Sequence, residues 1–156
     1  MSAYGLILFI HSYLRWIALG LAVVVIGRAF AGWRRSREWQ RTDEKLHIAL
    51  VASVDVQFLL GLILYIFLSP ITQAFFMGPG PAMKDPVLRF FGVEHITTML
   101  VAIALVHISR TRSKKASTAQ LRQRRVWTMT LAALVLMLLS VPWPFLDIGR
   151  PLVRGF

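Results

Sequence analysis

The sequence contains no cysteine and few acidic residues, and both absences narrow the range of functions. Without cysteine the chain forms no disulfides and no thiolate metal sites, and iron–sulfur clusters are excluded. Only 7 of the 156 residues are Asp or Glu, against 18 that are Lys or Arg, so the net charge is +11. No nucleophile elbow, phosphate-binding loop or dinucleotide fingerprint occurs in the chain. Hydrolytic and nucleotide-dependent activities therefore have no support.

Long polar stretches are also absent. The residues are 56% hydrophobic and the mean hydropathy is +0.62, which is too apolar for a soluble domain of this size. Four apolar runs have about the 20 residues that are needed to cross a hydrocarbon core of about 30 Å. They are Tyr4–Phe30, Leu46–Leu68, Val87–Ser109 and Val126–Phe145. The first run has no basic segment before it and no small-residue cleavage site, so we expect a retained helix. We predict one all-α membrane domain over residues 1–156.

Basic residues gather between the first two runs and between the last two. The first segment holds Arg28, Arg34, Arg35, Arg37, Arg41 and Lys45, and the second holds Arg110, Arg112, Lys114, Lys115, Arg122, Arg124 and Arg125. The positive-inside rule makes both segments cytoplasmic. Short connections favour an up-down-up-down four-helix bundle in the bacterial inner membrane, with both termini and the loop Ser69–Pro86 periplasmic. Anionic lipid headgroups are the expected partners of the basic segments, and nucleic acid is not.

Ionisable residues inside apolar runs are costly, and by default they mark functional sites. His11 lies about 12 Å below the outer end of the first run, and His95 lies about 12 Å below the outer end of the third. Two histidines at one depth on different helices match bis-histidine ligation of a haem iron, and neutral imidazole is the commonest metal ligand. In the alternative interpretation, the agreement in depth is chance and both imidazoles are hydrogen-bonded packing residues.

A second set of ionisable residues lies close to these histidines. Arg15 is one turn deeper than His11, and Asp55 lies at a similar height on the second run. An ion pair between Arg15 and Asp55 is predicted, with Glu94 as the alternative partner of Arg15. In a functional interpretation, Arg15 meets a haem propionate or a quinone headgroup, Glu94 hydrogen-bonds a ligand imidazole, and Asp55 or Glu94 relays protons. In a structural interpretation, the ion pair only fixes the helix register.

The two remaining histidines, His47 and His107, lie near the cytoplasmic ends of their runs. They are candidate ligands for a second haem on the other side of the membrane. His95 and His107 are 12 residues apart on one predicted helix, which separates them by about 18 Å but turns their side chains about 120° apart. His47 follows a charged tetrapeptide, and an interfacial position without any ligand is the alternative.

Four segments carry a family resemblance. They read HSYLRW (11–16), QFLLGLILY (57–65), AMKDPVLRFFGVEH (82–95) and VPWPFLDIGRPL (141–152). Over nearly its whole length the chain resembles a family of small bacterial membrane proteins labelled cytochrome B. The resemblance implies a b-type haem, with His11 and His95 at the matching ligand positions. Members of that family often carry a histidine where this chain has Asp55, so the chain departs from the pattern at that position. A more distant similarity to four-helix cytochromes that exchange electrons with quinones is one of fold.

We therefore predict an integral membrane b-type cytochrome that carries electrons between a quinol or quinone and a partner in the outer compartment. No catalytic residue is assigned. One alternative is a cofactor-free structural or assembly subunit of a larger respiratory or photosynthetic membrane complex. Another is a small transporter that uses His11, Asp55, Glu94 and His95 as a polar path, although the sequence shows no broken-helix pair.

Overall fold

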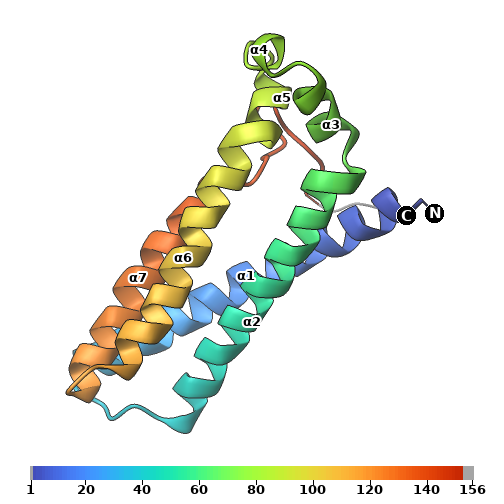
Figure 1. The fold of residues 1–156 in the computed structure, drawn as a ribbon. Helices are drawn as coiled ribbons and strands as arrows, with labels where there is room; N and C mark the ends of the chain where they lie inside the picture. The colour runs from blue at the N-terminus through green and yellow to red at the C-terminus, as the bar shows by residue number, and fades with distance from the viewer. Residues whose placement is uncertain (1, 153–156) are drawn as a thin grey trace.

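The computed structural model describes residues 2–152, which form helices joined by short segments, with no β-strand among them. The four longest helices are α1 (Ala3–Arg34), α2 (Arg41–Ile63), α6 (His95–Lys114) and α7 (Ala119–Leu139) (Figure 1). Helix α1 packs against α2 and α7, while α6 packs against α7 and more sparsely against α2. The all-α prediction is confirmed for the described part of the chain.

Three helical stretches are long and apolar enough to cross a membrane. They are Ala3–Arg34, Arg41–Leu68 and Pro86–Lys114. Each contains one of the first three predicted runs and extends beyond it, mainly at the basic end. The extension follows from residue type, because Lys, Arg and Glu are good helix formers and continue the helix past its apolar part.

Helix α7 differs from the predicted fourth run, Val126–Phe145. It begins earlier, at Ala119, so that three arginines fall within its first two turns, and it ends at Leu139. The uncharged part that remains is shorter than the roughly 20 residues of a typical spanning helix. The early end has a clear cause, since Pro142 and Pro144 supply no backbone donor and cannot continue a helix.

Two π-helical turns lie at the end of the molecule opposite the basic segments. Turn η1 (Leu64–Leu68) continues α2, and turn η2 (Phe90–Glu94) leads directly into α6. The two turns are joined by a hydrogen bond of 2.7 Å, in which the Tyr65 hydroxyl donates to the carbonyl oxygen of Gly92. The hydrophobic pattern did not predict them. Such turns occur frequently at functional sites.

Three short helices cover the same end (Figure 1). They are α3 (Pro70–Met77), α4 (Pro79–Ala82) and α5 (Pro86–Arg89), and each has proline at its first position. Proline is favoured there because the amide hydrogen that it lacks would have no partner within the helix. Ser69 caps α3 and Asp85 caps α5 through their side-chain oxygens. The proline-rich segment is thus a compact cover rather than one helix.

Gly92 is where the cover meets α6, and it allows a close approach. A Cβ atom on Gly92 would lie 2.5 Å from the ring of Phe75, which is itself buried. We therefore expect Gly92→Ala to destabilise the protein by about 1–3 kcal/mol through overpacking. Unfolding in detergent, followed by circular dichroism, measures the loss. Gly27→Ala is the matched control, because a Cβ there meets nothing within 4 Å. Equal unfolding midpoints for the two variants would contradict this packing.

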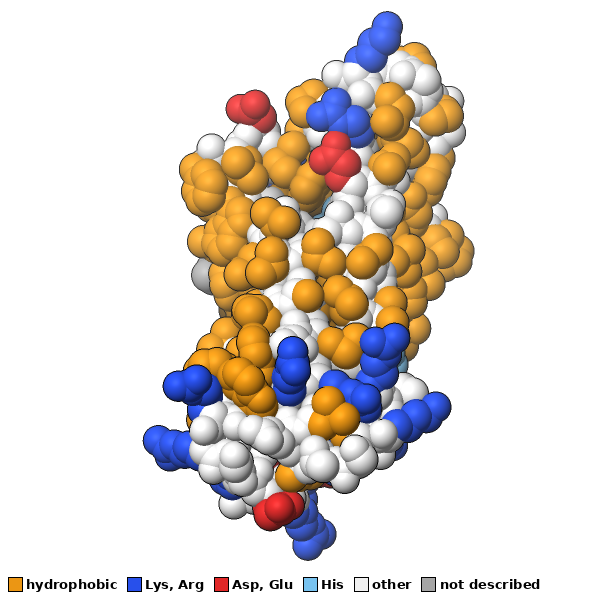
Figure 2. Space-filling view, turned by 90° about the vertical axis from the view of Figure 1, so that its left-hand side faces the viewer, with side chains coloured by type: hydrophobic (Ala, Val, Ile, Leu, Met, Phe, Trp, Pro, Cys, Tyr) orange, Lys and Arg blue, Asp and Glu red, His pale blue; other side chains and the backbone are white. Residues whose placement is uncertain are grey.

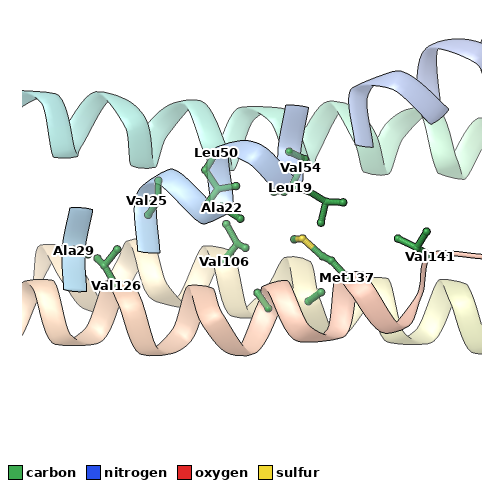
Figure 3. Packing of buried hydrophobic residues seen from close by; sticks show 13 residues of the cluster. Leu19, Ala22, Val25, Ala29, Leu50, Val54, Val106, Val126, Met137 and Val141 are labelled. Atoms are coloured by element: carbon green, nitrogen blue, oxygen red, sulfur yellow. The ribbon is translucent and has the colours of Figure 1, made fainter. Parts of the chain in front are cut away.

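The buried core lies between α1 and the other three long helices (Figure 3). Leu19, Ala22 and Val25 of α1 line one side, and Val106 of α6 and Met137 of α7 lie among the residues opposite. Many core residues are Ala or Val, and small side chains let membrane helices approach closely. The core therefore fixes the positions of the four long helices relative to one another.

Lys and Arg side chains gather at one end of the molecule, while hydrophobic side chains cover its length (Figure 2). Two carboxylates organise this end. Asp43 accepts hydrogen bonds from Arg28 at 2.9 Å and from Arg37 at 2.8 Å. Glu44, the next residue, accepts from Arg110 of α6 and Arg122 of α7, and from the indole of Trp39. The scarce acidic residues thus link all four long helices at the basic end.

Candidate functional site

A cavity of about 290 Å³ lies at the end of the molecule opposite the basic segments. Helix α1, helix α2, both π turns, helix α6 and the segment after α7 contribute to its walls. Its volume is close to the lower limit of about 300 Å³ for pockets that hold organic ligands. Apolar and aromatic side chains such as Leu8, Phe58 and Phe91 form much of the lining. A few polar groups converge on it, which is the usual composition of a ligand site.

His11 of α1 and His95 of α6 both line this cavity, and both also line a smaller hollow of about 40 Å³ beside it. The two imidazoles come from helices that are separate in the sequence, and both helices border this cavity. Sequence depth alone placed them at one level, and the structure places them at one cavity. Met99, one turn after His95 on α6, belongs to the same wall.

The His95 ring is held in a defined tautomer. Its Nδ1 lies 2.9 Å from the carbonyl oxygen of Ser140, which can only accept a hydrogen bond. That carbonyl is available because α7 ends at Leu139 and its last carbonyls have no helical partner. Nδ1 therefore carries the proton, and Nε2 keeps its lone pair. Metal-ligating histidines almost always show this second hydrogen bond.

The His11 ring has coordination capacity left as well. Its Nδ1 is buried and has no hydrogen-bond partner among the described residues. Buried polar atoms normally have a partner, so an unsatisfied ring nitrogen beside a cavity is consistent with a missing ligand. The ring packs against Gly61, where a Cβ would lie 3.0 Å from His11 Cε1. The backbone is held by Gln57, whose amide donates to the carbonyl oxygen of His11 at 3.0 Å.

Two arginines line the cavity, whereas no Asp or Glu does so within the described residues. Arg15 donates from Nη2 to the carbonyl oxygen of Leu152 at 3.1 Å, and the Trp16 indole donates to the same oxygen at 3.2 Å. Arg150 lies with its guanidinium 5.6 Å from the ring centroid of Phe91. The described lining therefore carries two guanidinium groups, which suit a largely apolar ligand that carries a negative group.

The predicted ion pair between Arg15 and Asp55 is not formed. Asp55 instead lies 2.7 Å from His107 Nε2, on the outer side of α2 and α6. The side chains of Arg15 and Asp55 point to different sides of the bundle. The depth of a residue along its helix does not determine the side to which its side chain points. Asp55 is therefore not a residue of this cavity.

Glu94 does not accompany His95 into the cavity. It forms an exposed ion pair with Arg89 at 2.6 Å, in the turn that precedes α6. The Glu94 side chain is 48% exposed, whereas the next two residues, His95 and Ile96, line the cavity. Neither predicted contact of Glu94, with a ligand imidazole or with Arg15, is formed among the described residues.

His47 and His107 do not converge into a second ligand pair. His47 is fully buried, with Nε2 3.4 Å from the Ser109 hydroxyl, and it lines neither of the two hollows described above. His107 is half exposed and binds Asp55. One histidine therefore faces the interior and the other faces outward. Their similar depth did not reveal this, because each residue along a helix turns the side-chain direction by about 100°.

Several residues of the site were not identified from the sequence. Tyr65, Ser140 and Arg150 contribute through the π turn, the end of α7 and the segment that follows it. None of these residues is an ionisable group deep in an apolar run, and none is marked by the helical period of the hydrophobic residues. The proline pair after Ser140 was the one available signal, since it predicts a helix end with free carbonyl groups.

No group of three or more His, Asp or Glu side chains that could hold a metal ion occurs in residues 2–152. The two imidazoles at the cavity are thus too few for a metal held by protein ligands alone. Comparison of the chain with protein-family models, with curated proteins and with solved structures finds no match.

Proposed function

We propose that this chain is an integral membrane protein of a bacterial inner membrane, with its four long helices arranged up-down-up-down. Three apolar stretches of spanning length and a basic end support this arrangement. By the positive-inside rule, the basic end is cytoplasmic and contacts anionic lipid headgroups. The termini and the cavity are then on the periplasmic side.

Within this arrangement, the cavity would hold a b-type haem through His11 and His95. The main support is that two imidazoles from different helices line one cavity, one with its Nδ1 proton bound to Ser140 and one with an unsatisfied buried nitrogen. A haem needs only two protein ligands, because its macrocycle supplies the other four. The donor set that is too small for a bare metal ion therefore fits this cofactor.

The residues around the two histidines have matching roles. Arg15 and Arg150 offer guanidinium groups to the propionates, for which Arg is well suited. Ser140 orients the His95 ring, and Gly61 leaves room for the His11 ring. A haem with two imidazole ligands exchanges single electrons and has no open position for oxygen. The protein then carries electrons between a membrane quinol or quinone and an acceptor or donor in the periplasm.

The optical spectrum of the purified protein tests this function. Protein made in haem-supplied cells is expected to bind about one haem per chain, with b-type bands in the reduced-minus-oxidised spectrum. The haem is expected to be extracted by acidic organic solvent, because the chain has no cysteine to bind it covalently. Absence of these bands, together with absence of iron by metal analysis, would leave a cofactor-free structural subunit as the remaining function.

Gly61 provides a test of the cavity shape. Gly61→Val adds a branched side chain where even a Cβ would lie 3.0 Å from His11 Cε1, so it displaces the imidazole. We expect a several-fold lower haem content, since ligand positions must be held within about 0.5 Å. Gly20→Val on α1 is the matched control, because a Cβ there meets nothing within 4 Å. Equal haem contents in the two variants would show that His11 is not a ligand.

A further inference from the structure

A second polar feature lies between α2 and α6, outside the cavity. Asp55 Oδ1 and His107 Nε2 are 2.7 Å apart, and the two side chains are 45% and 48% exposed. No other carboxylate–histidine pair occurs among residues 2–152. The other ion-paired carboxylates bind arginines, which do not lose their proton in proteins. Asp55 and His107 are therefore the one ion pair in this part of the chain in which both partners can exchange a proton.

The position of the pair relates it to the cavity. His95, Met99 and Ile103 line the cavity wall along α6 at intervals of four residues, and His107 is the next residue in that series. On α2, Asp55 lies three residues before Phe58, which also lines the cavity. The pair lies about one turn, or about 6 Å, from the cavity lining toward the basic end, on the outer side of the two helices.

The surroundings of the pair on its other side are charged. Arg110 follows His107 by three residues, and it binds Glu44 near the start of α2. Beyond them lies the end of the molecule that carries most Lys and Arg side chains (Figure 2). His47 on α2 is buried against Ser109 and does not contact the pair. Neither α1 nor α7 supplies a hydrogen bond or ion pair to Asp55 or His107 within the described residues.

We propose that Asp55 and His107 form a proton-exchange site that takes up a proton from water at the basic end when the cavity gains negative charge. This proposal rests on the proposed function, in which an electron from a quinol or a chemical reductant enters the cavity. One proton from water then binds the carboxylate or the imidazole, no other bond changes, and the proton returns to water when the electron leaves. Paired ionisable residues of membrane proteins commonly serve as such proton relays.

Infrared difference spectroscopy of the purified protein in detergent tests this proposal in two arms. In the first arm the buffer is acidified without any reductant, and a protonated-carboxyl band that shifts in deuterated water is expected. In the second arm dithionite reduces the haem-loaded protein at constant pH, and the same band is expected to appear. Asp55→Asn is expected to lose the band in both arms, and circular dichroism shows that this nearly isosteric variant is folded. His107→Gln, which keeps a hydrogen-bond donor, is expected to change the band.

The two arms separate this proposal from the haem assignment. The first arm needs no haem, so a missing Asp55 band there overturns the proton-exchange site whatever the cofactor content. If the protein binds haem but reduction produces no Asp55 band, the haem assignment stands and the coupling of the pair to the cavity is wrong. If the wild-type protein contains no haem, the proposed function fails, and the first arm alone decides whether the pair exchanges protons.

Discussion

His95→Ala is expected to abolish stable haem binding, with haem content at least about tenfold below that of the wild-type protein. Even loss of a group that only orients a metal ligand costs about 10–100-fold in metal affinity, and loss of the ligand itself costs more. The same result is expected for His11→Ala, because both imidazoles line one cavity. Haem content is measured from the absorption of purified, folded protein after expression with added haem precursor.

The controls for this result are His47→Ala and His107→Ala, which remove histidines that do not line the cavity. Both are expected to keep wild-type haem content per folded chain. A double variant of His11 and His95 is expected to bind no more haem than either single variant. If His47→Ala or His107→Ala lost the haem while His95→Ala retained it, the site would be at the basic end instead.

Asp43→Ala is expected to lower the free energy of unfolding by about 2–3 kcal/mol. The Asp43 side chain is only 3% exposed and accepts hydrogen bonds from Arg28, Arg37 and the backbone amide of Gln40. Its removal takes the carboxylate acceptor from Arg28, Arg37 and the Gln40 amide, and hydrogen bonds to a charged group contribute more to stability than neutral ones. Chemical unfolding in detergent micelles, followed by helix content, measures the change.

Glu38→Ala is the matched control for Asp43→Ala. Glu38 lies in the same connection between α1 and α2, is exposed, and has no ion pair among the described residues. Its removal is expected to change stability by less than about 0.5 kcal/mol. Similar losses in the two variants would mean that the basic end is held by net charge and not by this bonded carboxylate.

Helix positions were largely predictable because hydrophobic run length is a direct signal for long apolar helices. The residues at which the helices begin and end were less predictable. The stretch that ends in α6 continues five residues past Ser109, since charged residues there remain helical. Helix α7 begins seven residues before Val126 for the same reason. Run length reports where a helix is apolar, and helix length depends on propensity and on breakers such as Pro142.

The residues of the candidate site were also only partly predictable from the sequence. Depth along the helix placed His11 and His95 at one level, and both line one cavity. Depth says nothing about which face a side chain occupies, so Glu94 was assigned to the cavity but pairs with Arg89, and Asp55 was assigned to Arg15 but pairs with His107. Faces depend on helix rotation, which the two π turns alter by adding a residue to a turn.

The periodicity of hydrophobic residues did not predict which residues of the irregular segments contribute to the cavity. Arg150 reaches the cavity because the segment after α7 returns over its end, and Leu152 is held there by Arg15 and Trp16. The Ser140 carbonyl contributes only because α7 stops before it. Such contacts depend on tertiary structure, and a pattern of hydrophobic residues carries no signal for them.

The most direct test of the central proposal, that His11 and His95 would both hold one haem iron, is electron paramagnetic resonance of the oxidised protein. We expect a low-spin ferric haem signal of the bis-imidazole type in the wild-type protein, and loss of that signal in both His11→Ala and His95→Ala. A high-spin signal in the wild-type protein, or a low-spin signal that survives either substitution, would contradict shared ligation by these two histidines.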